Sequence, residues 1–148
     1  MTDTRYEVDF YQWTQAQAAA LRSNDLGALD LEHLAEEIES IGASERRAIR
    51  SHLCVLLMHR LKWTYQPDKR SESWRSSMYT ARVFIEETVQ DSPILRGFLP
   101  EALGWAYPRA RTDVAVETGL PLATFPETCP WPLERVLDED FFPEEAAQ

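Results

Sequence analysis

Apolar side chains recur at helical spacing along most of the chain, and no strand-like alternation persists for more than a few residues. Asp9 stands in an N-cap position before the first such stretch, with Gln12 three residues later as in a capping box. A second helix is expected after Asp30. Its apolar positions lie three or four residues apart and are Leu31, Leu34, Ile38 and Ile41. Gly42 stands where a C-terminal glycine belongs, so we expect this helix to end there.

The strongest apolar pattern lies between Ser44, which can cap a third helix, and Pro67, which must end it. One face of this helix carries Ile49, Leu53, Leu56 and Leu57. Other sides carry Val55, Met58 and Leu61. Apolar residues on several sides are typical of a central helix that packs against more than one neighbour. If the turn at residues 42–44 makes the second and third helices an antiparallel hairpin, polar side chains of the two helices could approach each other.

A fourth helix is expected to begin near Ser71 or Ser73. Its buried stripe is Trp74, Met78, Ala81, Ile85 and Val89. Ser92 followed by Pro93 is a cap with proline at the first helical position, which predicts a short fifth helix.

Pro100 can open a further helix that Gly119 ends, and Pro108 should kink it. Residues 119–148 are rich in proline and predict an extended arm, with a short helix over 132–137 and an acidic tail. The sequence therefore predicts an all-α fold. We expect a compact bundle of five or six helices with a proline-rich C-terminal arm, and residues 1–148 as a single domain.

Composition agrees with an ordinary globular chain, because 44% of the 148 residues are hydrophobic and 27% are charged. The N-terminal residues have neither the basic start nor the apolar stretch of a signal peptide. The longest apolar run, residues 53–58, is too short to cross a membrane. Cys54 and Cys129 lack the spacing of a disulfide framework or a zinc site. These features favour a cytoplasmic protein with no membrane partner.

Charge is distributed unevenly around a basic centre. Residues 46–82 carry nine basic and two acidic side chains, whereas the remaining chain carries six basic and 23 acidic ones. The basic segment could form a surface for an anionic partner. It could equally lie against the acidic helices of the same protein.

Four side chains of the second and third helices could bind zinc or iron if these helices form a hairpin: His33, Glu37, His52 and His59. Carboxylate and imidazole groups from facing helices hold metals in helical bundles. In a metal-dependent hydrolase Glu37 would serve as base or ligand, His59 as ligand or acid, and Lys62 would stabilise phosphate charge. No HExxH motif is present, and a hydrogen bond between His59 and Glu37 explains the same residues.

A second candidate site combines positive charge with flat aromatic rings at the end of the third helix and in the loop after it. Its residues are Trp63, Gln66, Lys69, Arg70, Trp74 and Arg75, following Lys62. Such a surface suits phosphates and unstacked bases of a nucleic acid. The same tryptophans could close the core beneath a connecting loop, with Lys and Arg stems covering apolar surface.

Several segments together resemble the bacterial family called domain of unknown function 29. They are YEVDFYQWTQAQAAALR, LDLEHLAEEIESIGASERR, LLMHRLKWTYQP and TGLPLATFPETCPWPLERVLDEDFFP, which span residues 6–143. The resemblance implies an all-helical protein of bacterial origin and implies no activity. Matching positions include Glu36, Glu37, Glu39, His59, Lys62, Trp63, Gln66 and Pro67. Arg60 occupies a position that is usually apolar in the pattern, and Pro108 interrupts a helix that usually reads through. His33 and His52 lie outside the pattern, which leaves Glu37 with His59 as the pair of interest.

The function that we expect is therefore a protein-interaction or oligomerisation module, using the basic aromatic surface over residues 62–75. Its partner would be a second copy or another protein, and no cofactor is required. A metal-dependent, nuclease-like hydrolase and a nucleic-acid-binding protein are the alternatives. The hydrolase needs Glu37 and His59 to lie within reach of each other.

Overall fold

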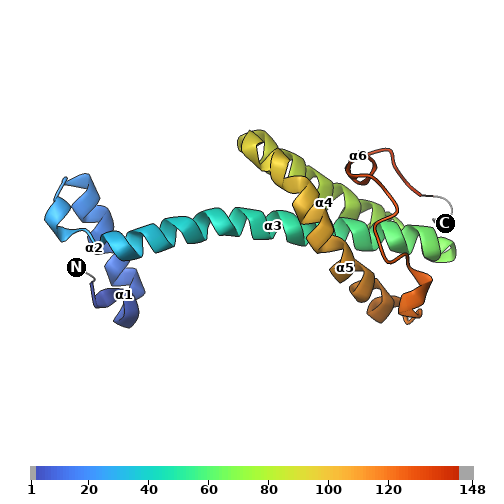
Figure 1. Cartoon of the computed structure of the whole chain (residues 1–148), viewed down its shortest axis with the longest axis horizontal. Helices are drawn as coiled ribbons and strands as arrows, with labels where there is room; N and C mark the ends of the chain where they lie inside the picture. Colours follow the sequence, from blue (N-terminus) through green and yellow to red (C-terminus); the bar gives the residue numbers. More distant parts are fainter. Residues whose placement is uncertain (1–2, 144–148) are drawn as a thin grey trace. The chain divides into compact units, whose positions relative to one another are not determined.

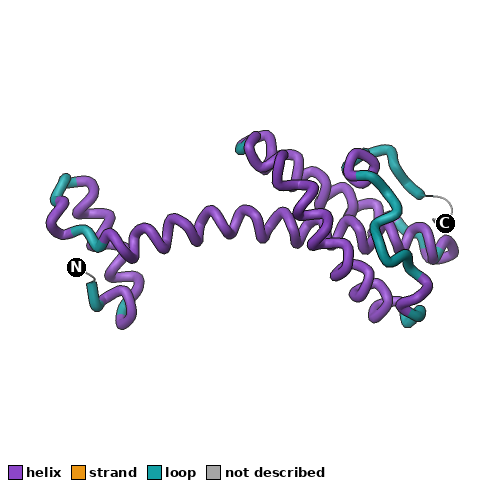
Figure 2. The backbone as a smooth tube through the Cα atoms, viewed as in Figure 1, coloured by secondary structure: helices purple, strands orange, loops and turns teal. Residues whose placement is uncertain are grey.

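The computed structural model describes residues 3–143, and in this range every regular element is a helix (Figure 2). The α-helices are α1 (Arg5–Val8), α2 (Phe10–Arg22), α3 (Leu31–Tyr65), α4 (Glu72–Asp91), α5 (Leu99–Thr118) and α6 (Leu133–Val136). Short 3-10 helices cover Leu26–Ala28, Pro67–Lys69, Pro93–Phe98 and Leu122–Thr124. The prediction of an all-α fold with five or six helices is confirmed.

The chain forms two compact units, one up to Ser44 and one from Glu45 onward, and α3 contributes residues to both. We call them the N-terminal unit and the C-terminal unit. The expectation that residues 1–148 form a single domain stays a prediction.

The predicted helix end at Gly42 and the predicted cap at Ser44 are wrong, because α3 continues through residues 42–44 without a break, and no hairpin forms there. Gly42 does not adopt the left-handed conformation that a terminating glycine needs; within residues 3–143 the only glycine with positive φ is Gly119. A glycine inside a helix costs only about 1 kcal/mol relative to alanine, so residues 42–44 weaken the helix without ending it. The helix begins where predicted, after Asp30, whose Oδ1 accepts a hydrogen bond from the His33 N–H.

Local chemistry explains the other helix boundaries. Asp9 accepts a hydrogen bond from the backbone N–H of Gln12, and Ser71 caps α4 in the same way. Pro67 follows the end of α3. Gly119 ends α5 with φ at 76°, a conformation that an L side chain rarely adopts. These boundaries agree with the sequence predictions.

The main hydrophobic core belongs to the C-terminal unit, where α4 and α5 pack on the C-terminal part of α3 and α5 crosses it (Figure 1). The α3 face predicted to be buried, Ile49, Leu53, Leu56 and Leu57, is fully buried. Helix α4 contributes Met78, Ala81, Ile85 and Val89, and α5 contributes mainly small residues, Ala102, Ala106, Ala110 and Val114. Small residues on α5 allow its backbone to approach its neighbours closely.

The arm after Gly119 packs on this core through Phe125, Trp131 and Val136, all of which are buried. Arg60 of α3 holds it there. Its guanidinium donates hydrogen bonds to the carbonyl oxygens of Val136, Asp138 and Phe141.

Candidate functional site

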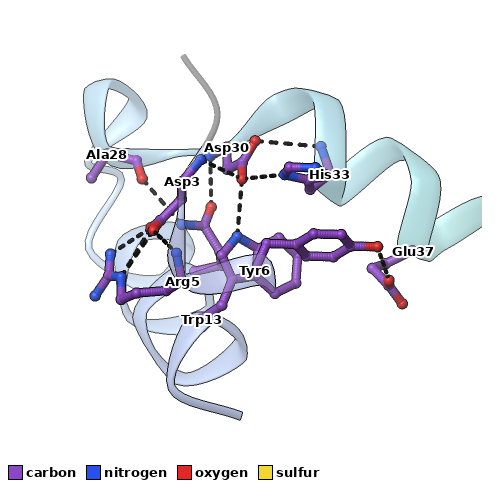
Figure 3. Close-up of polar contacts among 9 residues, drawn as sticks. Asp3, Arg5, Tyr6, Trp13, Ala28, Asp30, His33 and Glu37 are labelled. Carbon is purple, nitrogen blue, oxygen red and sulfur yellow. Dashed lines mark hydrogen bonds and ion pairs between the residues drawn. The ribbon is translucent and has the colours of Figure 1, made fainter. Parts of the chain in front are cut away.

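A buried carboxylate organises the N-terminal unit (Figure 3). Asp30 is only 1% exposed, and its Oδ2 accepts hydrogen bonds from the Trp13 Nε1 at 3.0 Å and the Asp3 N at 2.8 Å. The same oxygen lies 2.7 Å from the His33 Nδ1. The Asp30 N–H donates to the side chain of Gln17 at 2.7 Å. One carboxylate thus joins the N-terminal segment, α2 and the first turn of α3.

These contacts shift the protonation of both members of the Asp30–His33 pair. Burial alone would raise the pKa of Asp30, but the hydrogen bonds from Asp3, His33 and Trp13 outweigh it and hold the pKa well below its usual range. The hydrogen bond to Asp30 raises the pKa of His33. The pair is therefore held as carboxylate and imidazolium over a wider pH range than either free side chain would give.

Tyr6 binds the adjacent turn of α3. Its hydroxyl donates to Glu37 Oε1 at 2.5 Å, and its ring stacks on His33 with the centroids 3.8 Å apart. The hydrogen bond to Glu37 raises the pKa of Tyr6 to about 12. Figure 3 shows Tyr6 lying between Trp13 and the side of α3 that carries His33 and Glu37. The part of α3 that packs inward in this unit is therefore polar.

The apolar stripe at the start of α3 faces solvent. Leu31, Ile38 and Ile41 are each 68% exposed, and Leu34 is only partly covered. An apolar stripe with helical spacing usually faces the core of its own protein, and these three residues do not. At about 100° per residue, His33 lies on a different side of α3 from the stripe, and Glu37 lies at the edge of the stripe next to Ile41. The N-terminal unit thus uses polar contacts for its own packing and leaves an apolar helix face unpartnered.

The residues predicted for metal binding and catalysis occupy separate environments. Glu37 belongs to the N-terminal unit and is bound by Tyr6, whereas His59 belongs to the C-terminal unit, with its Nδ1 2.8 Å from the Val55 carbonyl oxygen. Burial lowers the pKa of His59. The hairpin that would have brought Glu37 to His59 does not form. Among residues 3–143 no three His, Cys, Asp or Glu side chains form a group that could hold a metal.

Lys62, expected to stabilise phosphate charge, is buried instead. Its Nζ lies 2.8 Å from Glu117 Oε1 of α5 and 4.6 Å from the centre of the Trp74 ring. His52 stacks on Phe84 of α4. These two side chains fasten α3 to its neighbouring helices.

The predicted basic aromatic surface forms a packed layer. Trp63 is only 4% exposed, and its carbonyl oxygen accepts a hydrogen bond from Arg70 Nε at 2.8 Å. The guanidinium groups of Arg70 and Arg75 lie 5.0 and 4.7 Å from the centre of the Trp63 ring. Trp74 is partly buried, whereas Lys69 is exposed and Gln66 is partly exposed. Trp63 therefore offers no free face for a stacked base.

Two hollows adjoin this layer, and Arg75 lines both. The first has a volume of about 230 Å³ and is lined by Arg60, Arg75, Met78, Tyr79, Arg82, Glu139, Asp140 and Phe142. The second is more open, with a volume of about 500 Å³, and is lined by Trp63, Arg70, Ser71, Glu72 and Arg75. The sequence indicated positive charge in this region. It could not reveal that Arg60, Arg75 and Arg82 line one hollow, because residues 139–142 of the distant arm complete that hollow.

The fold and these sites define an all-α protein. Its N-terminal unit is held together by the polar contacts of Asp30 and Tyr6, and its C-terminal unit is rich in arginine. The family model described as domain of unknown function DUF29 matches residues 5–142, so the chain belongs to that family. This confirms the resemblance seen in the sequence. The search of curated proteins and the search of solved structures find no match. In the described residues no helix is both long and apolar enough to cross a membrane.

Proposed function

We propose that this protein is an interaction module whose N-terminal unit binds a basic amphipathic helix of a partner protein. The observation that carries the proposal is the exposed apolar stripe of Leu31, Ile38 and Ile41 on α3. Spacings of seven and three residues place these side chains along one line of the helix, as in a helix-to-helix contact.

The packing of the N-terminal unit supports this role. Isolated exposed hydrophobic residues are common, but an aligned set on one helix face is typical of a binding surface. Tyr6 and Asp30 secure the polar side of the same turns, so the stripe stays directed away from the unit's interior. A partner helix could therefore bind without unfolding the unit.

Charge indicates the kind of partner. Residues 1–44 carry nine acidic and two basic side chains, so the N-terminal unit as a whole carries a strong negative charge. Completing the burial of three Leu or Ile side chains would contribute about 3–6 kcal/mol. Association costs about 4–15 kcal/mol, so attraction between opposite charges must add to the apolar contact. A second copy would bring a second acidic unit, whereas a basic helix supplies the missing attraction.

The experiment uses a fluorescent peptide probe and the full chain. The probe is a helix with leucines at spacings of three and four residues and lysines beside them, compared with a scrambled peptide of the same composition. We expect the ordered peptide to bind more tightly than the scrambled one, with affinity falling as salt rises. Ile38→Ser with Ile41→Ser should weaken binding by at least about tenfold.

The matched control is Ile94→Ser with Val116→Ser, which removes two even more exposed apolar side chains from the C-terminal unit. It should leave peptide affinity unchanged. Equal binding of the scrambled peptide, or an equal effect of the control variant, would refute the proposal. Analytical ultracentrifugation adds a further outcome: a dimer that strengthens with salt and is lost on Ile38→Ser with Ile41→Ser would assign the stripe to a second copy instead.

The setting that we propose is the bacterial cytoplasm, in keeping with the family resemblance and the two free thiols of Cys54 and Cys129. No observation favours the hydrolase, because Glu37, His59 and Lys62 each have another partner. The packed Trp63 likewise removes the main reason for proposing a stacked nucleic acid.

A further inference from the structure

Gly42 is a glycine that the fold of the chain does not itself require. It lies inside α3 and does not have the positive φ that favours glycine. Among residues 3–143, no atom beyond its own stretch of helix lies within 4 Å of the position that a Cβ would take. Glycine is the least favourable residue inside a helix apart from proline. Neither backbone conformation nor crowding by the described residues therefore accounts for a glycine at this point.

The position of Gly42 on α3 connects it to the exposed apolar stripe. Gly42 follows Ile38 by four residues, and Ala35 precedes Ile38 by three, so all three share one side of the helix. At about 100° per residue, Gly42 and Ala35 lie roughly 40° and 60° from Ile38, in the same direction. Both small residues are exposed. Along this edge of the stripe, the backbone of α3 is therefore almost bare at two points.

The size of the side chains at a contact decides how closely two helices can pack. Helix axes usually lie about 8–10 Å apart. Glycine and alanine let the backbones come closer, because little or no side chain stands between them. Closer packing brings more atoms of both helices into dispersion contact. A partner helix that crosses α3 at Ala35 and Gly42 would contact the backbone of α3 as well as the side chain of Ile38.

We infer that Gly42 marks the point where the partner helix approaches α3 most closely, and that this partner carries alanine or glycine there between its larger apolar side chains. Large side chains on both helices at the crossing would hold the two backbones apart. The inference rests on the proposed function. It adds a residue of this chain that determines specificity and a sequence feature of the partner.

The test adds a second fluorescent peptide, in which the central leucine of the ordered probe is replaced by alanine. The intact full chain should bind the alanine-centred peptide at least about threefold more tightly than the all-leucine peptide. Gly42→Ala should weaken binding of the alanine-centred peptide by at least about fivefold, because the added Cβ lies within the contact. The same substitution should slow amide exchange around residue 42, since alanine favours the helix. Weaker binding by a more stable helix cannot result from unfolding.

Gly104→Ala is the matched control. Gly104 also lies exposed inside an α-helix, α5, with no atom within 4 Å of the ideal Cβ position. This variant should slow exchange around residue 104 and leave the affinity for both peptides unchanged. Unchanged affinity in Gly42→Ala, or tighter binding of the all-leucine peptide by the intact chain, would overturn the inference. The proposed function would survive that result if Ile38→Ser with Ile41→Ser still weakened binding, whereas failure of both peptides to bind would overturn the two together.

Discussion

The indole N–H of Trp13 donates a 3.0 Å hydrogen bond to Asp30, a carboxylate that is almost completely buried. The two residues belong to different segments, one on α2 and one just before α3. Few large apolar side chains are buried in the N-terminal unit; Trp13 is the largest of them. The stability of the unit therefore depends strongly on the polar contacts of Asp30, because its hydrophobic core is small.

Replacing Asp30 with asparagine should loosen the N-terminal unit. The amide keeps the size of the carboxyl group but removes its charge and one acceptor, so the donors of Trp13, Asp3 and His33 cannot all be satisfied. We expect amide hydrogen exchange within α2 to accelerate by at least about tenfold. Asp25→Asn is the control, because Asp25 is exposed and its side chain caps no helix. Unchanged exchange in Asp30→Asn would contradict the role assigned to this carboxylate.

The stability of the same unit should fall on both sides of neutral pH. Asp30 raises the pKa of His33, with smaller contributions from Glu36 and Glu32, so the folded unit binds this proton more tightly than the unfolded chain does. That stabilisation is complete below the usual histidine pKa and is lost as pH rises through the raised value. The lowered pKa of Asp30 acts at the other end: its contribution is lost as pH falls through that lowered value.

An NMR titration of the Trp13 indole N–H, with amide exchange measured alongside, checks this pH dependence. His33→Gln should remove the loss of protection on the alkaline side and leave the acidic side in place. His52→Gln is the control, because His52 packs on Phe84 in the C-terminal unit. An alkaline loss that persists in His33→Gln would show that another group is responsible.

Sequence reasoning succeeded where the chemistry of a few adjacent residues decides the structure. The caps at Asp9 and Ser71 and the left-handed Gly119 act on their own helix ends, so local pattern was sufficient. The prediction failed at Gly42 because a glycine can either end a helix or lie within one. The free-energy difference between the two outcomes is small, so the neighbouring residues decide between them. The long helix that results separates Glu37 from His59 into different units.

Local sequence pattern could not predict two features: the direction in which an apolar stripe faces, and the hydrogen-bond partners of a buried arginine. The spacing of Leu31, Ile38 and Ile41 predicts one helix face but does not say whether it meets the protein's own core or another molecule. Arg60 was marked only as a departure from the family pattern. Its acceptors, which include Val136, lie more than seventy residues away, so no short-range signal could have identified them.

Arg60→Lys should release the C-terminal arm. Lysine keeps the charge but has a single nitrogen, which cannot reach the carbonyl oxygens of Val136, Asp138 and Phe141 together. Burial lowers the pKa of Arg60 to about 10, so the native residue is still charged at neutral pH. We expect a loss of about 2–4 kcal/mol in the free energy of unfolding, measured with urea, because charged hydrogen bonds in a buried site are broken.

Limited proteolysis should locate the effect of Arg60→Lys in residues 137–143, with faster cleavage than in the unchanged chain. Arg109→Lys, at an exposed arginine of α5, should change the free energy of unfolding by less than about 0.5 kcal/mol. If both variants lost the same stability, the hydrogen bonds of Arg60 to the arm would not be the cause.

Two glycines of the same region should respond to alanine with opposite signs. Gly119 has φ at 76°, where a Cβ is strained even though no atom lies within 4 Å of its ideal position, so Gly119→Ala should lower the free energy of unfolding by about 1 kcal/mol. Gly104 lies inside α5, also with no atom within 4 Å, and Gly104→Ala should raise it by about 0.5–1 kcal/mol through helix propensity. Urea denaturation of both variants provides the comparison. Destabilisation of similar size in both would mean that space around α5, and not the left-handed backbone at its end, controls the response.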